Sequence, residues 1–225
     1  ELAGAISNST IDEILGISRS KKNLAETAIM VEREIIGDPV GLQDQYHAAF
    51  GGFSKYTFQK DDVDIQECDW TSSDYDQLNT HELLISTGKT RDARNVLEQQ
   101  KLENSDLSKD KYFHEMVALV DNGYSLLRNG EDINRQKDFG MLINESWLRK
   151  KELAGAISNS TIDEIISIGL EYGAWGAKLL GAGNGGFVFF MGQPIVLEDI
   201  KLKLKGLNSV DIKFQSYGST SQPIL

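Results

Sequence analysis

The sequence predicts an α+β fold whose C-terminal half is ferredoxin-like, and three observations support this prediction. Residues 52–58 and 63–68 alternate like two paired strands around the turn Lys60-Asp61-Asp62. Residues 112–129 and 132–148 are amphipathic and predict a pair of helices in the middle of the chain. The last part of the chain combines a strand hairpin, a helix and a final strand.

The other segments complete this mixed architecture. Residues 21–36 predict a helix from an apolar side that includes Met30 and Ile35, and Gly37-Asp38-Pro39 would end it. Residues 161–172 predict another helix, because Thr161-x-x-Glu164 is a capping-box pattern. The remaining predicted elements are a short helix up to Phe50, a loop at 71–79, a strand at 82–86, a helix at 92–102, strands at 177–180 and 186–191, a helix at 194–207 and a strand at 210–214.

The chain contains an internal repeat of an unusual kind. Residues 1–14 and residues 152–165 have the same sequence, ELAGAISNSTIDEI, and the similarity stops abruptly after both copies. Structural repeats keep their pattern and lose their identity, so an identical copy indicates a recent duplication, an engineered splice or an error of register. The second copy leads into a predicted helix and a glycine-rich stretch, and the first copy is therefore interpreted as the displaced one.

Composition limits the classes of function. The 225 residues can bury a real core, and 40% hydrophobic with 25% charged residues is typical of a soluble protein. A net charge of −11 argues against non-specific nucleic-acid binding, although a group of backbone N–H donors could still bind a phosphorylated ligand. The single cysteine, Cys68, fits a reducing cytoplasm and is expected to be buried and inert. The sequence shows no metal-ligand spacing, no membrane-spanning apolar run and no signal-peptide pattern.

Two short stretches could carry chemistry. In Gly41-Leu42-Gln43-Asp44-Gln45 a carboxylate stands between two amides before a Gly-Gly turn, and Asp44 could be a cap, a turn residue or a catalytic group. The glycine-rich run at 181–186 lies between two predicted strands, which suits either a flexible hairpin loop or close approach of backbone to a ligand. It is not a Walker loop or a dinucleotide fingerprint, because a strand follows it. Lys178, just before it, could be a surface charge at a strand end or a neighbour of a bound phosphate, and the first interpretation is favoured.

These stretches resemble motifs of the GHMP small-molecule kinases. Gly176-Ala177-Lys178-Leu179-Leu180-Gly181-Ala182-Gly183-Asn184-Gly185-Gly186 is similar to the third motif of that superfamily, with Asn184 at a position often held by Gly. Gly41-Leu42-Gln43-Asp44-Gln45 is similar to the segment that carries the catalytic Asp in galactokinase-like members. Glu32 lies twelve positions before Asp44, where the family tends to place an acidic residue near magnesium. Together with Leu84-Ile85-Ser86-Thr87-Gly88-Lys89-Thr90-Arg91, these stretches most resemble the D-glycero-D-manno-heptose 7-phosphate kinase branch, and the resemblance covers about residues 20–225.

One part of the family pattern is missing. Such kinases carry an ATP phosphate loop of the Pro-x-x-x-Gly-Leu-Gly-Ser-Ser-Ser type, and this sequence has no such segment. Residues 1–14 stand where the helix after that loop is expected. The resemblance therefore implies a GHMP-kinase-like fold with a truncated N-terminal part, in which residues 1–90 are a remnant of the N-terminal domain and residues 91–225 are the C-terminal domain.

The resemblance implies a cytoplasmic sugar kinase that uses ATP and Mg²⁺ and phosphorylates a sugar or sugar-phosphate hydroxyl, with heptose 7-phosphate as the expected substrate. Asp44 would be the catalytic group and Glu32 would help to hold Mg²⁺. Gln43, Lys89 and Arg91 would bind the substrate, although Lys89 and Arg91 could equally belong to a solvated turn. The residues that would shape the ATP phosphate site are Gly181, Gly183, Gly185 and Gly186.

An alternative function stays open at this point. The chain could be a truncated, non-catalytic kinase relative that acts as a sugar-phosphate-binding or dimerisation module. A homodimer through the first copy of the repeat is a further hypothesis, since lost N-terminal strands would leave sheet edges or apolar faces uncovered. Neither nucleic acid nor a membrane is expected as a partner.

Overall fold

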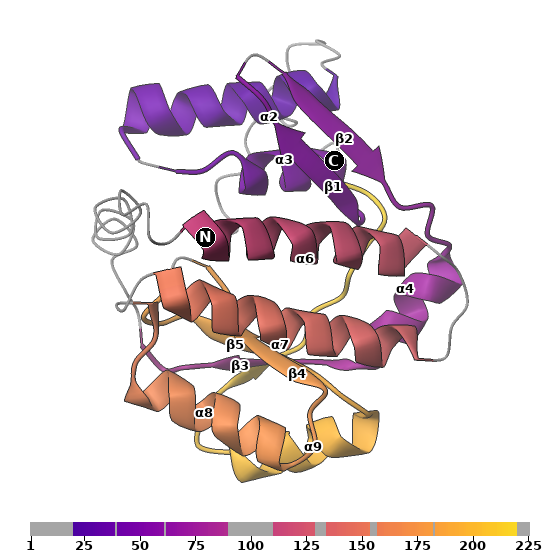
Figure 1. Cartoon of the computed structure of the whole chain (residues 1–225), viewed down its shortest axis with the longest axis vertical. Helices are drawn as coiled ribbons and strands as arrows, with labels where there is room; N and C mark the ends of the chain where they lie inside the picture. The colour runs from indigo at the N-terminus through magenta and orange to yellow at the C-terminus, as the bar shows by residue number, and fades with distance from the viewer. Residues whose placement is uncertain are drawn as a thin grey trace, which may run out of the picture. The chain divides into compact units, whose positions relative to one another are not determined.

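A computed structural model of the chain (Figure 1) describes residues 20–38, 40–60, 62–89, 110–128, 134–153, 157–181 and 183–219. The chain divides into two compact units, Glu1–Ser72 with Phe214–Leu225, and Ser73–Lys213. This division into compact units does not test the domain boundary at residue 90 that the resemblance implies, and that boundary stays a prediction. The first copy of the repeat, the helix predicted at 92–102 and Arg91 lie outside the described residues.

The first unit contains helices followed by a strand hairpin. Its described elements are α2 (Lys21–Met30), the π-helix η1 (Val31–Ile36), α3 (Gln43–Phe50), β1 (Ser54–Phe58) and β2 (Val63–Glu67). β1 and β2 pair antiparallel, as their alternation predicts. The helix predicted at 21–36 changes to π-helical hydrogen bonding in its last six residues. It ends at Gly37, whose φ of 78° is the left-handed conformation that glycine adopts without strain.

α2 buries less apolar surface than its sequence predicts. Met30 is 41% exposed and Ile35, in η1, is 70% exposed. The residue of α2 that is buried is Ala25, which packs with Tyr46 and Ala49 of α3. Because the side chain of Ala25 is small, α2 can pack closely against α3.

The second unit is built around an antiparallel sheet. Its described elements are α4 (Ser72–Leu78, which begins at the boundary), β3 (Glu82–Ser86), α6 (Asp110–Arg128), α7 (Arg135–Leu153), α8 (Ser160–Glu171), β4 (Gly176–Leu179), β5 (Phe187–Met191), α9 (Pro194–Lys203) and β6 (Ser209–Val210). Among the described residues the sheet has four strands in the order β4-β5-β3-β6, and every neighbouring pair is antiparallel. The chain order β-α-β-β-α-β with the first strand in an interior position is the ferredoxin-like arrangement, so this prediction is confirmed.

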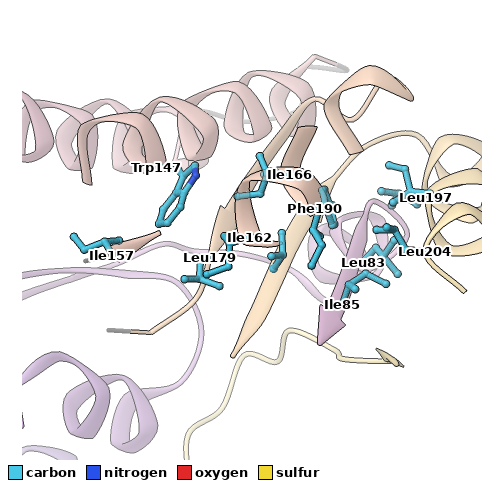
Figure 2. Close-up of a cluster of buried hydrophobic side chains, with 14 residues drawn as sticks. Leu83, Ile85, Trp147, Ile157, Ile162, Ile166, Leu179, Phe190, Leu197 and Leu204 are labelled. Atoms are coloured by element: carbon cyan, nitrogen blue, oxygen red, sulfur yellow. The ribbon is translucent and has the colours of Figure 1, made fainter. Parts of the chain in front are cut away.

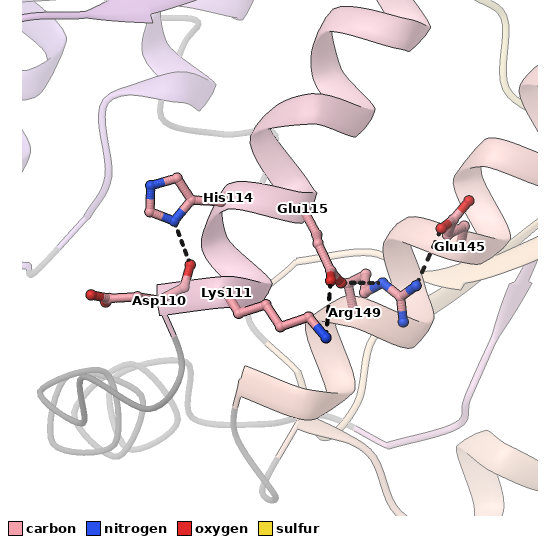
Figure 3. A network of polar contacts seen from close by, with 6 residues as sticks. All are labelled: Asp110, Lys111, His114, Glu115, Glu145 and Arg149. Carbon is pink, nitrogen blue, oxygen red and sulfur yellow. Dashed lines mark hydrogen bonds and ion pairs between the residues drawn. The ribbon is translucent and has the colours of Figure 1, made fainter.

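Helices cover both faces of this sheet. Figure 1 shows α7 on one face and α8 and α9 on the other, with α6 packed along α7. Arg149 of α7 joins the two long helices, because its Nε lies 2.8 Å from an oxygen of Glu115 on α6 (Figure 3). Among the helices that the structure describes, none has the length and apolar character needed to cross a membrane.

Most of the core lies between the sheet and the pair α8 and α9, and Trp147 of α7 also belongs to this cluster (Figure 2). Ile162, Ile165 and Ile166 recur at helical spacing on α8, and all three are buried. The alternate residues of β3 and β5 face them, and burial of each such side chain stabilises the fold by about 1.5–3 kcal/mol. The buried strand residues of this cluster are Leu83, Ile85, Ala177, Leu179, Val188 and Phe190.

Several elements differ from their sequence predictions, including α9, which ends at Lys203, and α7, which continues to Leu153. The loop predicted at 71–79 is wrong, because α4 forms there and buries Tyr75 and Leu78 at a spacing of three residues. The strand predicted at 210–214 is reduced to Ser209–Val210. α8 begins earlier than its capping-box pattern predicts, since Asn159 is the N-cap and accepts a hydrogen bond from the Ile162 N–H at 3.2 Å.

Candidate active site

In the first unit, η1 and α3 bring Glu32 next to the segment that carries Asp44. Gln43 and Asp44 are the first two residues of α3, and both are exposed. The following residue, Gln45, is buried, and its Nε2 donates a hydrogen bond to Oε2 of Glu32 at 2.5 Å. The acidic residue twelve positions upstream therefore lies beside the first turn of α3.

Arg33 shapes the connection between these two elements. Its Nε and Nη2 donate to the carbonyl of Val40 at 3.0 and 2.7 Å. Gly37 turns the chain at the end of η1, and Arg33 fixes the returning segment before α3 begins. Because α2 and α3 also pack through Ala25 and Tyr46, contacts within this unit hold Glu32 close to α3.

Gln45 is a buried polar residue at this site. It is 9% exposed, and within the described part of the chain its Oε1 is buried without a hydrogen-bond partner. The orientation of the amide follows from Glu32, since a carboxylate accepts hydrogen bonds and so requires the NH₂ group of Gln45 to face it. Further along α3, partial burial lowers the pKa of His47, while the charge of Asp44 acts in the opposite direction.

The donor set of the first unit fits magnesium. Among the described residues there is no group of three or more side chains that could hold a metal ion by themselves. Mg²⁺ usually takes one or two carboxylates and completes its shell with water and substrate phosphates. Glu32 and the exposed Asp44 are carboxylates of the kind that Mg²⁺ takes, and the hydrogen bond from Gln45 occupies only one of the Glu32 oxygens.

In the second unit, the glycine loop at 181–186 is tied to three neighbouring elements. Thr87, at the end of β3, accepts a hydrogen bond from the Gly186 N–H at 3.1 Å and donates one to its carbonyl at 3.0 Å. Asn159, the N-cap of α8, donates from Nδ2 to Oδ1 of Asn184 at 2.8 Å. Lys150 of α7 donates to the Gly181 carbonyl at 2.6 Å. The loop is thus held by side chains at both ends and in the middle.

Backbone conformation explains part of the glycine content of this loop. Gly183 has a φ of 128°, and a Cβ there would lie 2.9 Å from Cα of Ile157. Asn184 takes a left-handed φ of 59°, as its side chain permits, and its N–H donates to the Ile157 carbonyl at 2.7 Å. The N–H groups of Asn184 and Gly186 are therefore both engaged in hydrogen bonds within the protein.

Lys89 lies near the start of α8. Its backbone follows the exposed Gly88, and its Nζ donates to Oγ1 of Thr161, in the first turn of that helix, at 3.2 Å. The ammonium group therefore lies beside the positive end of the α8 dipole. An anionic ligand would be attracted by both positive charges. The expected partner Arg91 lies outside the described residues.

The interpretation of Lys178 as a surface charge at a strand end is wrong. The residue lies inside β4, and its Nζ donates to Oγ of Ser146 on α7 at 3.2 Å. Burial lowers the pKa of this ammonium group. Lys178 therefore joins β4 to α7 below the glycine loop. Cys68 is buried, as expected.

The candidate residues fall into two groups that belong to different units. Glu32, Gln43 and Asp44 lie in the first unit, whereas Lys89 and the glycine loop lie in the second. Two polar residues with evident structural roles at these groups, Gln45 and Thr87, are absent from the residues that the sequence predicts. Gln45 follows Asp44 in the sequence, and Thr87 lies two positions before Lys89. The sequence did not indicate that these two side chains are buried.

Comparisons with known proteins agree with the fold and the motifs. Residues 125–206 match the family model described as GHMP kinases C terminal. A D-glycero-alpha-D-manno-heptose 7-phosphate kinase of Campylobacter jejuni is 30% identical over 189 residues, which cover 81% of this chain and 53% of that protein. The chain thus spans about half the length of this curated relative.

Solved structures of such kinases share the fold. A D-glycero-D-manno-heptose 1-phosphate kinase from Bacteriodes thetaiotaomicron has a TM-score of 0.62 at 20% identity, covering 96% of this chain and 60% of that one. The Methanococcus jannaschii mevalonate kinase has a TM-score of 0.67 at 19% identity, covering 92% and 60%. The chain has the fold of the GHMP kinases. More particularly, residues 125–206 match the C-terminal family model of the GHMP kinases, so the predicted resemblance is confirmed.

Proposed function

We propose that this chain acts as an ATP-dependent sugar kinase that transfers the γ-phosphoryl group to a hydroxyl of heptose 7-phosphate. The 30% sequence identity with a heptose 7-phosphate kinase supports the substrate class. The match of residues 125–206 to the GHMP kinase C-terminal model supports the reaction type. In phosphoryl transfer the protein mainly orients the two reactants and offsets charge, so the reaction needs few side chains with well-defined positions.

The observation that carries this proposal is the hydrogen bond between Gln45 and Glu32. It places one carboxylate beside the turn that presents another, Asp44, to solvent. An exposed carboxylate at the start of a helix can accept or orient the proton of a substrate hydroxyl as the oxygen attacks phosphorus. Gln43, next to it and equally exposed, is the residue that we assign to hydrogen bonding with the sugar.

Glu32 is the residue that we assign to Mg²⁺, with Asp44 as its neighbour. Magnesium, when bound, offsets the negative charge of the nucleotide phosphates. The chain's own contribution is to keep the Glu32 carboxylate oriented through Gln45, so that one oxygen stays available. Both residues lie in the first unit.

The glycine loop and Lys89 are the parts that we assign to phosphate groups. Lys89 offers an exposed ammonium group near the N-terminus of α8, and Arg91 would add a bidentate donor for the phosphate already on the sugar. Gly181, Gly183, Gly185 and Gly186 keep the loop backbone free of side chains, so that nucleotide phosphates can approach it closely.

A thermal-shift titration with ATP and Mg²⁺ tests nucleotide binding. A ligand that binds only the folded state adds about 2.7 kcal/mol of stability at a concentration of 100 Kd, so we expect a saturable rise in Tm of several degrees. Mg²⁺ alone and ATP with EDTA are the controls. If millimolar nucleotide leaves Tm unchanged while heptose 7-phosphate alone raises it, the chain is a non-catalytic sugar-phosphate-binding module instead.

A further inference from the structure

Thr87 occupies the point where β3 ends and the glycine loop meets it. Although it carries a polar side chain, it is only 3% exposed. The antiparallel pairing of β3 with β5 reaches Ser86 and Phe187, so Thr87 and Gly186 stand opposite one another just beyond the last ladder pair. The backbone N–H of Thr87 continues the ladder by donating to the Gly186 carbonyl at 2.9 Å.

The hydroxyl of Thr87 adds contacts that the backbone cannot make. Oγ1 accepts the Gly186 N–H at 3.1 Å and donates to the Gly186 carbonyl at 3.0 Å. Oγ1 also lies 3.5 Å from the backbone N of Lys89. One buried hydroxyl therefore contacts the end of the glycine loop and the residue that we assign to the substrate phosphate.

We propose that Thr87 is a positioning residue that fixes the glycine loop relative to Lys89. Lys150 and Asn159 tie the loop to α7 and α8, whereas Thr87 links it to the end of β3. Gly186, with a φ of 109°, has no side chain of its own to restrain it, and the Thr87 hydroxyl takes over that restraint. The kinetic part of this inference rests on the proposed kinase function, whereas the structural part does not.

Amide hydrogen exchange by NMR tests the structural part in the intact chain. In the wild type, the Gly186 amide should exchange more slowly than that of Gly185, whose N–H has no hydrogen-bond partner among the described residues. Thr87→Val keeps the shape and removes the hydroxyl, so exchange at Gly186 should become about three- to tenfold faster. Thr87→Ser should restore the protection. Thr80→Val is the matched control, since its hydroxyl donates to the Gln77 carbonyl far along the chain from the loop.

Steady-state kinetics test the positioning role. If Thr87 aligns the loop for phosphoryl transfer, Thr87→Val should lower kcat about tenfold or more with a smaller change in KM, and Thr87→Ser should recover most of the loss. Two results would overturn the inference: fast exchange of the Gly186 amide in the wild type, or unchanged exchange of that amide in Thr87→Val. The wild-type measurement needs no variant, so the test remains possible if Thr87→Val does not fold. Faster exchange with unchanged kinetics would reduce Thr87 to a structural residue. A wild-type chain without activity would refute the kinase proposal and leave the exchange result standing.

Discussion

Asp44 and Gln45 are neighbours in sequence with opposite environments. Asp44 faces solvent at the start of α3, whereas Gln45 is buried and bonded to Glu32. Successive residues of a helix point about 100° apart, so a carboxylate directed outward and an amide directed inward can share one turn. This geometry is consistent with the roles that we assign: Gln45 orients Glu32, and Asp44 contacts the substrate.

Replacement of Asp44 by Asn tests its assignment. Because the side chain is exposed, Asp44→Asn should leave the fold intact while kcat for sugar phosphorylation falls by about 10²- to 10⁴-fold. Asp64→Asn, on the exposed side of β2, is the matched control and should keep full activity. If Asp44→Asn turns over like the wild type, Asp44 is not the catalytic group.

Glu82 should make stability depend on pH. Burial raises its pKa to about 8 from the ordinary value of 4.5, and its Oε2 is buried without a hydrogen-bond partner in the described part of the chain. The folded state thus favours the protonated form, so its contribution is complete below pH 4.5 and is lost as the pH rises toward 8.

Glu82→Gln removes this titration. The variant should be more stable than the wild type at pH 8 by about 1 kcal/mol, a figure reduced because the group is partly solvated. At pH 4.5 the two proteins should be nearly equal. Urea denaturation at both pH values measures the difference, and Glu67→Gln on β2 is a control with an exposed side chain. Equal stabilities at pH 8 would show that Glu82 is solvated in the folded state.

At the scale of elements, the contact of α7 with β4 depends on two glycines. A Cβ at Gly176 would overlap the carbonyl oxygen of Gly140, so the helix can approach the strand only because both residues lack side chains. This approach places Lys178 of β4 against Ser146 of α7, below the glycine loop. The position of the loop therefore follows from the close packing of one helix on an edge strand.

Gly176→Ala should destabilise the protein by about 2–3 kcal/mol or more, because the backbone oxygen of Gly140 must move to admit the methyl group. Gly206→Ala is the control, since a Cβ at Gly206 meets nothing within 4 Å, and its effect should stay within about 0.5 kcal/mol. Thermal or urea unfolding compares the two. Equal effects would mean that α7 and β4 are not as closely packed as described.

Sequence patterns predict the elements well where local periodicity and burial agree. The three isoleucines of α8 repeat at helical spacing and are all buried, and the strands β3 and β5 were predicted from their apolar runs. α4 was missed because a polar segment with only Tyr75 and Leu78 on its buried side has almost no periodic signal. Asn159, and not Thr161, is the N-cap of α8, and its Nδ2 also donates to Asn184, 25 positions along the chain.

The candidate site could be predicted only in part for a similar reason. The motifs around Asp44 and Gly183 are local, and the sequence therefore indicates them. The contacts that hold those motifs are not local. Gln45 and Glu32 are 13 positions apart, and Thr87 and Gly186 are 99 positions apart. The environment of Lys178 was also misjudged, since a lysine near a loop is usually exposed and only the packing of α7 covers it.

At the scale of the whole molecule, the proposed chemistry is divided between two compact units. The first contains both carboxylates, and the second contains the glycine loop, Lys89 and the ferredoxin-like sheet. Each unit positions its own residues through its own packing and hydrogen bonds.

Phosphoryl transfer followed by ³¹P NMR tests this account most directly. The chain is mixed with ATP, Mg²⁺ and heptose 7-phosphate, with galactose and mevalonate as comparison acceptors and Asp44→Asn as the inactive control. We predict stoichiometric formation of ADP and a heptose bisphosphate, with heptose 7-phosphate preferred by about 100-fold or more over acceptors that lack the phosphate. A folded chain that binds ATP and heptose 7-phosphate but forms no new phosphate ester would contradict the proposed function.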